Sequence, residues 1–409
     1  MKHMFGLLSA RVVLAFVCCL AAWPLVVAVA ETATTIAAES TAEKTAEKTA
    51  ERTAVGTAET ATATAPDTLP WTAIVDAKYT GTAGTPGTAG VPTFRNIGDA
   101  LSSTSVNGGV RTVIFIRNGR YREKLTIDRP RITLKGESRD GAVITFDAVS
   151  DTPAPGGGTY GTRGSYTLRI VAPDFRAEHL TIENAYDYAA NAAKSDSNPT
   201  KYKNPQGVAL MTDLGNDRAS FVDVKLLGNQ DTLFTNSGRS WFYKSMIAGH
   251  VDFIFGAGVS LFEDSDIISR DRGSKTNNGY IAAPSTNKAQ PYGLVFLNSR
   301  LKKENPDMAA NSVTLGRSWH PFADPNAVGQ AIYINCWMDN HIGDKGWDRM
   351  SSVDSTGTRV WYEPESARFF EYGSTGPGAV SGTARRQLTK AQAATYSRAA
   401  MFGDWTPQP

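Results

Sequence analysis

The stretch from Gly228 to Gly256 reads GNQDTLFTNSGRSWFYKSMIAGHVDFIFG and holds two aspartates among apolar and aromatic neighbours. Asp231 is followed by Thr-Leu-Phe and Asp252 by Phe-Ile-Phe, so neither looks like ordinary solvated surface. A carboxylate costs free energy to bury unless it is paired or has a chemical role. The two aspartates are 21 positions apart, close to one coil of a β-solenoid with turns of roughly 20 residues. Because stacked coils are about 4.8 Å apart, we expect both carboxylates to face one groove.

From Trp71 onward the chain is rich in short strand-forming runs that Gly, Asn, Asp and Pro interrupt. The runs recur at intervals of roughly 10 to 25 residues, and helical periodicity is scarce. A sandwich, a propeller and a β-solenoid all stay open on this pattern. We favour the solenoid because three segments share the order β-run, Asn or Asp turn, β-run: RAEHLTIENAYD (176–187), RASFVDVKLLGNQD (218–231) and VSLFEDSDIISRD (259–271).

Two helices are expected beside the strand-rich runs. One covers FRNIGDALSS (94–103), and the other covers LTKAQAATYSR (388–398), where Thr389 is placed to serve as N-cap. The segment TGTAGTPGTAG (80–90) reads as a glycine-rich loop.

The first thirty residues have the organisation of a signal peptide. Lys2 and Arg11 precede an apolar run, VVLAFVCCLAAWPLVVAVA, that ends in a small-x-small cleavage site. An uncleaved anchor is the alternative, because the run approaches the roughly 20 apolar residues that span a bilayer. Residues 31–69 are rich in Thr, Ala and Glu, with almost no large apolar side chains, which predicts a disordered spacer. We therefore divide the chain into a signal peptide (1–30), a spacer (31–69) and one β domain (70–409).

Charge and cysteine content exclude several classes of protein. Cleavage after Ala30 removes Lys2 and Arg11 and no acid, so the formal charge falls from +2 to 0. Nucleic-acid binding, which requires a basic face, is therefore not expected. Cys336 becomes the single cysteine of the mature chain and has no intramolecular disulfide partner. The five histidines show no metal-ligand spacing, and no G-x-S-x-G element is present.

Four further residues occur at solenoid-compatible spacings around the aspartates. Gln230 precedes Asp231, and Gln206 lies one coil earlier; their amides could stabilise a developing oxyanion. In LGRSW (315–319), Arg317 and Trp319 are two positions apart and so lie on the same side of an extended segment. Arg317 could keep one aspartate ionised, and Trp319 could offer a flat surface to a sugar ring. Each has a plain alternative: an aspartate that caps a turn, an amide ladder, a surface ion pair, a core tryptophan. These structural alternatives are less convincing together, because the aspartates, glutamines, arginine and tryptophan would all need structural roles at spacings that a solenoid brings together.

These motifs resemble the pectin methylesterases (pectinesterases), carbohydrate esterases that fold as a right-handed parallel β-helix. QDTLF (230–234) and GHVDFIFG (249–256), preceded by QGVAL (206–210) and followed by LGRSW, occur in the family's order. APDFRAEHLTIENAYDY, GYIAAPST and YGLVFLNSRL resemble the bacterial branch. The resemblance extends from about Trp71 to the C-terminus, and it implies an all-β fold with short terminal helices.

Carried over residue by residue, the resemblance implies a role for each member of the central group. Asp252 would be the nucleophile, Asp231 the general acid and then base, and Arg317 the residue that orients Asp252. Gln206 and Gln230 would form the oxyanion hole. No metal or cofactor is implied.

Substrate contacts and two departures complete the resemblance. Trp319 would stack on galacturonate, and Ser318 and Gly207 stand where the family usually has Pro and Ala. Ser318 leaves the backbone before Trp319 less restricted than Pro would. The remaining positions similar to substrate contacts are Thr162, Val251, Arg272 and Met350.

The resemblance also implies a substrate and a setting. The substrate would be methylated homogalacturonan (pectin), hydrolysed at its C6 methyl esters to pectate and methanol during plant cell wall degradation or modification. The enzyme would be secreted, through the periplasm in a Gram-negative source, and would act as a monomer off the membrane once the signal is cleaved. A polysaccharide lyase is one alternative, because a β-helix that binds uronides can also be a lyase. A non-catalytic β-helix that acts as an adhesin or glycan-binding module is the other.

Overall fold

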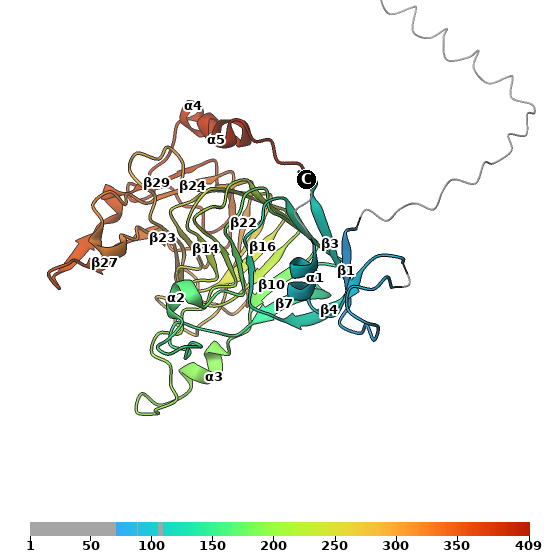
Figure 1. Cartoon of the computed structure of the whole chain (residues 1–409). Coiled ribbons are helices and arrows are strands. Elements are labelled where there is room, and N and C mark those ends of the chain that lie inside the picture. The colour runs from blue at the N-terminus through green and yellow to red at the C-terminus, as the bar shows by residue number, and fades with distance from the viewer. Residues whose placement is uncertain (1–70, 88, 105–108) are drawn as a thin grey trace, which may run out of the picture. The chain divides into compact units, whose positions relative to one another are not determined.

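Parallel strands in three sheets wind the chain into a β-helix (Figure 1). The structure is a computed structural model that describes residues 71–409 except 88 and 105–108. These residues belong to the compact unit Thr68–Pro409. The predicted signal peptide (1–30) and spacer (31–69) lie outside the described residues.

Each coil contributes one strand to each sheet. Neighbours within a sheet are, with few exceptions, three strands apart in the chain, and every pairing in these three sheets is parallel. The first sheet comprises β2 (Thr93–Phe94), β1 (Ala73–Val75), β3 (Thr112–Ile116), β6 (Ile132–Gly136), β9 (Arg176–Glu178), β12 (Ala219–Val222), β15 (Arg239–Tyr243), β18 (Val259–Glu263), β21 (Leu294–Leu297), β24 (Gln330–Ile334) and β29 (Arg368–Tyr372). The prediction of a right-handed parallel β-helix is confirmed.

The other two sheets have eight strands each. The second comprises β4 (Gly119–Arg122), β7 (Ala142–Phe146), β10 (Thr181–Asn184), β13 (Lys225–Leu227), β16 (Met246–Gly249), β19 (Asp266–Ser269), β22 (Arg300–Lys303) and β25 (Trp337–Met338). The third comprises β5 (Leu125–Ile127), β8 (Leu168–Ile170), β11 (Leu210–Thr212), β14 (Leu233–Thr235), β17 (Ile254–Gly256), β20 (Gly279–Pro284), β23 (Val313–Arg317) and β26 (Trp347–Asp348). An antiparallel hairpin, β27 (Met350–Val353) and β28 (Arg359–Tyr362), stands apart from them.

An aromatic stack fills the interior. Phe221, Phe242, Phe262, Phe296 and Tyr333 come from successive coils of the first sheet, with ring centroids 4.6, 4.8, 4.7 and 4.4 Å apart. These separations match the spacing between neighbouring strands, so each ring lies flat on the next. The repeated β-run of the sequence is therefore the repeat of this core.

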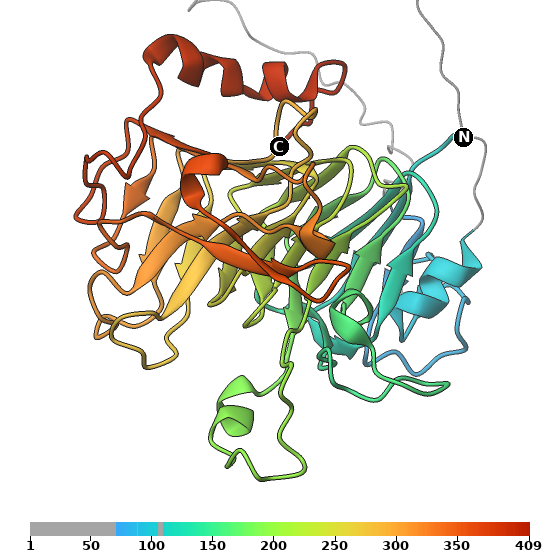
Figure 2. The same cartoon turned by 90° about the vertical axis from the view of Figure 1, so that its left-hand side faces the viewer.

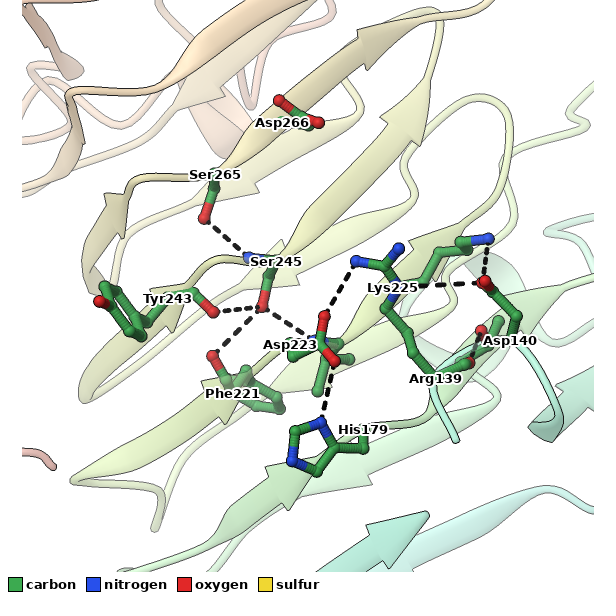
Figure 3. Close-up of polar contacts among 12 residues, drawn as sticks. Arg139, Asp140, His179, Phe221, Asp223, Lys225, Tyr243, Ser245, Ser265 and Asp266 are labelled. Carbon is green, nitrogen blue, oxygen red and sulfur yellow. Dashed lines mark hydrogen bonds and ion pairs between the residues drawn. The ribbon is translucent and has the colours of Figure 1, made fainter. Parts of the chain in front are cut away.

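A serine ladder closes the corner between the first and second sheets (Figure 3). The hydroxyl of Ser245 accepts the Val224 N–H at 3.1 Å, and that of Ser265 accepts the Ser245 N–H at 3.1 Å. The residue before each serine, such as Lys244 with φ 48°, has the left-handed conformation that turns the chain. Cys336 occupies the same place two coils on from Ser265 and points its thiol at the Phe296 carbonyl. Cys336, the single cysteine among the described residues, is thus part of the corner.

The helices lie outside the coils. The first expected helix is present as α1 (Ile97–Ser103). The second, expected near 388–398, is present as α4 (Lys390–Ala393), which continues as η3 (Ala394–Tyr396). It ends before Ser397, whose hydroxyl accepts the Ala400 N–H and starts a further helix that was not predicted. Thr389 is an N-cap, as predicted, in a capping box with Gln392. The remaining segments are α2 (Gly161–Gly164), α3 (Tyr188–Ala192), η1 (Pro321–Ala323), η2 (Pro364–Ser366) and α5 (Arg398–Phe402).

The C-terminal helices cover the outer face of the first sheet. Trp241 and Ile332 from the sheet are buried together with Met401 and Phe402 from α5. α2 and α3 lie in connections from the second sheet to the third, and the β27–β28 hairpin lies in the connection from β26 of the third sheet to β29 of the first. Among the described residues, no helix has the length and apolar character needed to cross a bilayer.

Candidate active site

The two aspartates lie on adjacent coils at the corner between the second and third sheets. Asp231 comes two residues before β14 and Asp252 two residues before β17, and these strands pair in register. The Asp231 N–H donates to the Val251 carbonyl at 3.1 Å, and this hydrogen bond joins the turns of the two adjacent coils directly. Both aspartates have positive φ, 64° and 50°, a conformation that is uncommon for residues other than glycine. The 21 residues between the two aspartates therefore make up one coil of the β-helix, as expected.

Arg317 holds Asp252 through a two-pronged ion pair. Its Nε donates to Oδ1 at 2.9 Å and its Nη2 to Oδ2 at 2.6 Å. Arg317 belongs to β23, two strands beyond β17, and its guanidinium lies 3.9 Å over the ring of Tyr280 from the strand between them. Burial lowers the pKa of Arg317, but the charge and hydrogen bonds of Asp252, together with Tyr280 and Asp348, raise it above its ordinary value. The fork aims the Asp252 carboxylate in one direction.

Asp231 has a different environment. Its side chain has no hydrogen-bond donor within the described residues, and 9% of the residue is exposed. Burial raises the pKa of this carboxyl well above its usual range, the negative charge of Asp252 raises it further, and Arg317 offsets part of the effect. Two carboxyl groups side by side, one paired with a cation and one favouring its proton, is the arrangement that divides acid and nucleophile roles.

The two glutamines lie beside the aspartates on adjacent coils. The Gly207 N–H donates to the Gln230 carbonyl at 3.1 Å, so Gln206 and Gln230 are neighbours across the corner. Among described residues, neither side-chain amide group donates to a protein acceptor. Because the Gln206 Oε1 is buried without a partner, its NH₂ end is the one left to meet a bound molecule. The glutamines can thus present N–H donors above the aspartates.

A cleft of ≈ 840 Å³ opens over this group. Figures 1 and 2 show α2 and the β27–β28 hairpin on the same side of the β-helix as β14 and β23. Thr162 of α2 and Met350 of β27 line the cleft. Trp319 meets the rings of Phe234 and Phe255 edge-on at 6.1 and 5.6 Å. The predicted site residues that line the cleft are Thr162, Gln206, Gln230, Asp231, Asp252, Trp319 and Met350.

Two predicted substrate contacts lie outside the lining of this cleft. Val251 is buried, and its carbonyl is occupied by the Asp231 N–H. Arg272 donates its side-chain N–H groups to the carbonyls of Asn277 and Asn278 at 2.8 and 2.9 Å. Both residues therefore support the neighbouring backbone in this structure.

A sequence model of the family described as Pectinesterase matches residues 85–403. The chain belongs to the pectinesterase family. It is 50% identical to pectinesterase A of Dickeya chrysanthemi over 326 residues, covering 77% of this chain and 88% of that protein. A pectin methylesterase crystallised with a hexasaccharide is 47% identical, with a TM-score of 0.78 over 83% of this chain and 99% of that one. The pectin methylesterase of Yersinia enterocolitica is 44% identical, with a TM-score of 0.73 over 77% and 100%.

This pectinesterase is a carboxylic ester hydrolase, and its two departures from the family pattern have local explanations. At Gly207, a Cβ would lie 2.9 Å from Oδ1 of Asn184, whose amide donates to the Ala148 carbonyl at 2.8 Å. Ser318 is buried, accepts the Gly329 N–H at 3.1 Å and contacts the imidazole of His320 at 3.1 Å. Hydrogen bonds thus hold the backbone before Trp319 where the family has a proline ring.

Several residues of the pectinesterase cleft were missed from the sequence. Phe234 and Phe255 each follow a site aspartate by three positions, a spacing that would have indicated a shared face. Arg163 had no sequence signal: it donates at 2.7 Å to Asp213, which Arg169 and Asn236 also bind. The other missed lining residues are Tyr160, Gly161, Asn236, Ala283, Pro321, Phe322 and Asp324.

Proposed function

We propose that this pectinesterase hydrolyses the C6 methyl esters of methylated homogalacturonan, with Asp252 as nucleophile and Asp231 as general acid and base. The observation that carries the proposal is the two-pronged Arg317–Asp252 pair beside a carboxyl with a raised pKa, at the floor of the cleft. An ester hydrolase needs a nucleophile, a proton donor for the leaving alcohol and donors for the oxyanion. Asp252, Asp231 and the pair Gln206 and Gln230 are proposed for these three roles, and all four residues line the cleft.

In the first step, Asp252 attacks the C6 carbonyl carbon. A bond forms between a carboxylate oxygen and C6, and negative charge develops on the former carbonyl oxygen. The side-chain N–H groups of Gln206 and Gln230 donate to that oxygen. As the C6–O bond to the methoxy group breaks, the protonated Asp231 gives its proton to the departing oxygen, and methanol leaves. The product is an anhydride between Asp252 and the galacturonate.

In the second step, water replaces methanol. Asp231, now a carboxylate, takes a proton from a water molecule whose oxygen attacks C6. The bond between C6 and Asp252 breaks, which restores the Asp252 carboxylate, and Asp231 keeps the proton taken from water. The galacturonic acid product loses its remaining proton to solvent and leaves as the carboxylate. Arg317 holds Asp252 in one orientation through both steps, so the cycle ends in its starting state.

Aromatic and apolar side chains are proposed to bind the polysaccharide. Trp319 offers a face to the galacturonate ring, and Thr162 and Met350 contact it from the two walls of the cleft. Val251 and Arg272 support the floor of the site and remain proposed contacts for neighbouring sugars. Homogalacturonan alternates CH-rich faces with polar edges, which suits a cleft with both kinds of lining.

Methanol release from methylated pectin tests the proposal. Asp252→Ala should lower the rate by several orders of magnitude, as removal of one member of a catalytic group commonly does. Asp264→Ala is a matched control, since Asp264 has the same backbone conformation, φ 52°, at the opposite corner and is exposed. The control should keep wild-type activity. If Asp252→Ala retained more than about a tenth of it, the assignment would be wrong.

The same assay separates the alternatives. An esterase releases methanol and acid, a lyase forms an unsaturated product that absorbs ultraviolet light, and a non-catalytic module does neither. Export, a role in plant cell wall degradation and a monomeric state are proposed with the function. N-terminal sequencing of protein recovered from the culture medium, together with its mass in solution, tests those proposals.

A further inference from the structure

His250 lies directly before Val251 and Asp252 and is 2% exposed. Its Nδ1 accepts the N–H of the next residue, Val251, at 2.8 Å. An imidazole whose Nδ1 accepts must carry its proton on Nε2 and be neutral. Burial lowers the pKa of His250 to about 3, and the charges of Arg272 and Arg270 add to the shift. The ring therefore acts as an acceptor that does not titrate near neutral pH.

Val251 is the residue that links the two aspartates. Its N–H is held by His250, its carbonyl accepts the Asp231 N–H at 3.1 Å, and Asp252 follows it in the chain. Both aspartates have the positive φ that residues with side chains rarely adopt. Such a backbone persists only where surrounding contacts hold it. Because its N–H and C=O are both occupied, the position of Val251 sets how the two carboxyl groups are spaced.

His250 is itself held on three sides. Its N–H donates to the Asn229 carbonyl at 3.0 Å, and its carbonyl accepts the Tyr280 N–H at 2.8 Å. The ring of Tyr188 packs edge-to-face on the imidazole at 4.4 Å. Tyr188 begins α3, in the insertion that projects from the β-helix in Figures 1 and 2. Within the described residues Nε2 has no acceptor, so the polar role of the ring rests on Nδ1.

We propose that His250 is a positioning residue for ester hydrolysis, holding the Val251 peptide through Nδ1 and thereby the relative placement of Asp231 and Asp252, while Tyr188 braces the ring. This inference rests on the proposed function of the two aspartates. His250 contacts neither substrate nor the reacting atoms. Loss of its acceptor would leave the Val251 N–H buried without a partner and release the corner between the carboxyl groups.

Two substitutions separate the acceptor from the bulk of the ring. His250→Leu fills the space but removes the acceptor, whereas His250→Asn places an oxygen near the position of Nδ1. His341→Leu is the matched control, because His341 is also buried, and its Nε2 contacts Ser269 at 3.1 Å away from the cleft. Circular dichroism and melting temperature establish folding, and methanol release is measured well below every melting temperature.

We expect His250→Leu to lower kcat about 100-fold, the effect of a displacement of about 1 Å in a catalytic group, with KM within about threefold. His250→Asn should recover kcat to within about tenfold of wild type. His341→Leu should lower the melting temperature but leave kcat within about twofold.

Three outcomes would overturn the inference: an unchanged kcat in His250→Leu, equal losses in the Leu and Asn variants, or a loss in His341→Leu as large as that in His250→Leu. If His250→Leu does not fold, His250→Gln replaces it, because the glutamine side-chain oxygen lies one methylene further from the backbone than that of asparagine. The kcat of His250→Gln must then fall below that of His250→Asn by the factor expected for His250→Leu. Asp252→Ala is measured alongside. Activity in that variant would refute the proposed function itself, whereas an inactive Asp252→Ala with a normal His250→Leu refutes only the positioning role.

Discussion

At the residue scale, two aspartates in matching backbone positions have been given different chemistry by their neighbours. Asp252 receives both arms of Arg317, whereas Asp231 receives no hydrogen bond from a side chain in the described part of the chain. The difference arises from reach: the Arg317 side chain crosses Tyr280 and ends at Asp252. The Asp252 carboxylate is thereby paired with a cation, whereas the raised pKa of Asp231 favours its protonated form.

The raised pKa of Asp231 predicts a stability that depends on pH. The folded protein binds this proton more tightly than the unfolded chain does, so the stabilisation is complete below the ordinary aspartate pKa of about 4 and is lost as pH rises through the raised pKa. Asp231→Asn stays neutral at every pH. Its melting temperature should exceed that of wild type by a margin that grows as pH rises above about 4, while methanol release is nearly abolished. Calorimetry across this pH range checks it, and a constant margin would contradict it.

At the element scale, the serine ladder explains why the unpaired Cys336 is tolerated in the core. The Cys336 thiol meets the Phe296 carbonyl at 3.4 Å and the Ile334 carbonyl at 3.6 Å. On the preceding coil, the Ser299 hydroxyl meets the Phe262 and Leu297 carbonyls at 3.1 and 3.2 Å. The two side chains make equivalent contacts one coil apart.

We therefore predict that Cys336→Ser is nearly neutral. The hydroxyl repeats the contacts of Ser299, so the free energy of unfolding should change by about 1 kcal/mol or less, with full activity. Cys336→Ala, which removes the donor and leaves a void, should cost more. Burial raises the pKa of Cys336 to about 12, so the native thiol should resist alkylation that proceeds in denaturant. Denaturant unfolding of both variants checks the order, and a costlier Ser variant would refute it.

At the scale of the whole molecule, a stack of coils has two open ends that must be closed. At one end α1 buries Ile97, Ala100 and Leu101 against the first strands. At the other end Arg385 and Glu371 form a fully buried pair, with both contacts at 2.5 Å, and Arg385 also donates to the Gly378 carbonyl at 3.0 Å. Closure by an ion pair in place of a helix makes the C-terminal end sensitive to the loss of one charge.

Arg385→Met is predicted to destabilise the domain by about 3–5 kcal/mol, because Glu371 would be left as an uncompensated buried charge. Arg120→Met is the control, since the Arg120–Glu183 pair leaves 61% of the arginine side chain exposed and should be worth about 1 kcal/mol or less. Denaturant unfolding of the two variants measures the difference. Equal losses would show that the buried pair does not close the end.

The sequence by itself determined the coils and the central members of the site. Strand-forming runs, turn residues and the 21-residue spacing all report contacts between one coil and the next, and such contacts repeat at the length of a coil. Asp231, Asp252, Gln206 and Gln230 lie on adjacent coils, so their proximity could be read from spacing together with the family resemblance.

Only the tertiary structure decided the contacts that skip a coil or come from insertions. Arg317 reaches past Tyr280 to Asp252, Asn184 occupies the space that makes position 207 a glycine, and Tyr188 arrives from α3 to brace His250. None of these contacts recurs in the sequence at the spacing of one coil. Each depends on how far a single side chain reaches in the folded chain. The raised pKa of Asp231 has the same origin, since it depends on the burial of the carboxyl group in the folded chain and on the negative charge of Asp252 on the adjacent coil.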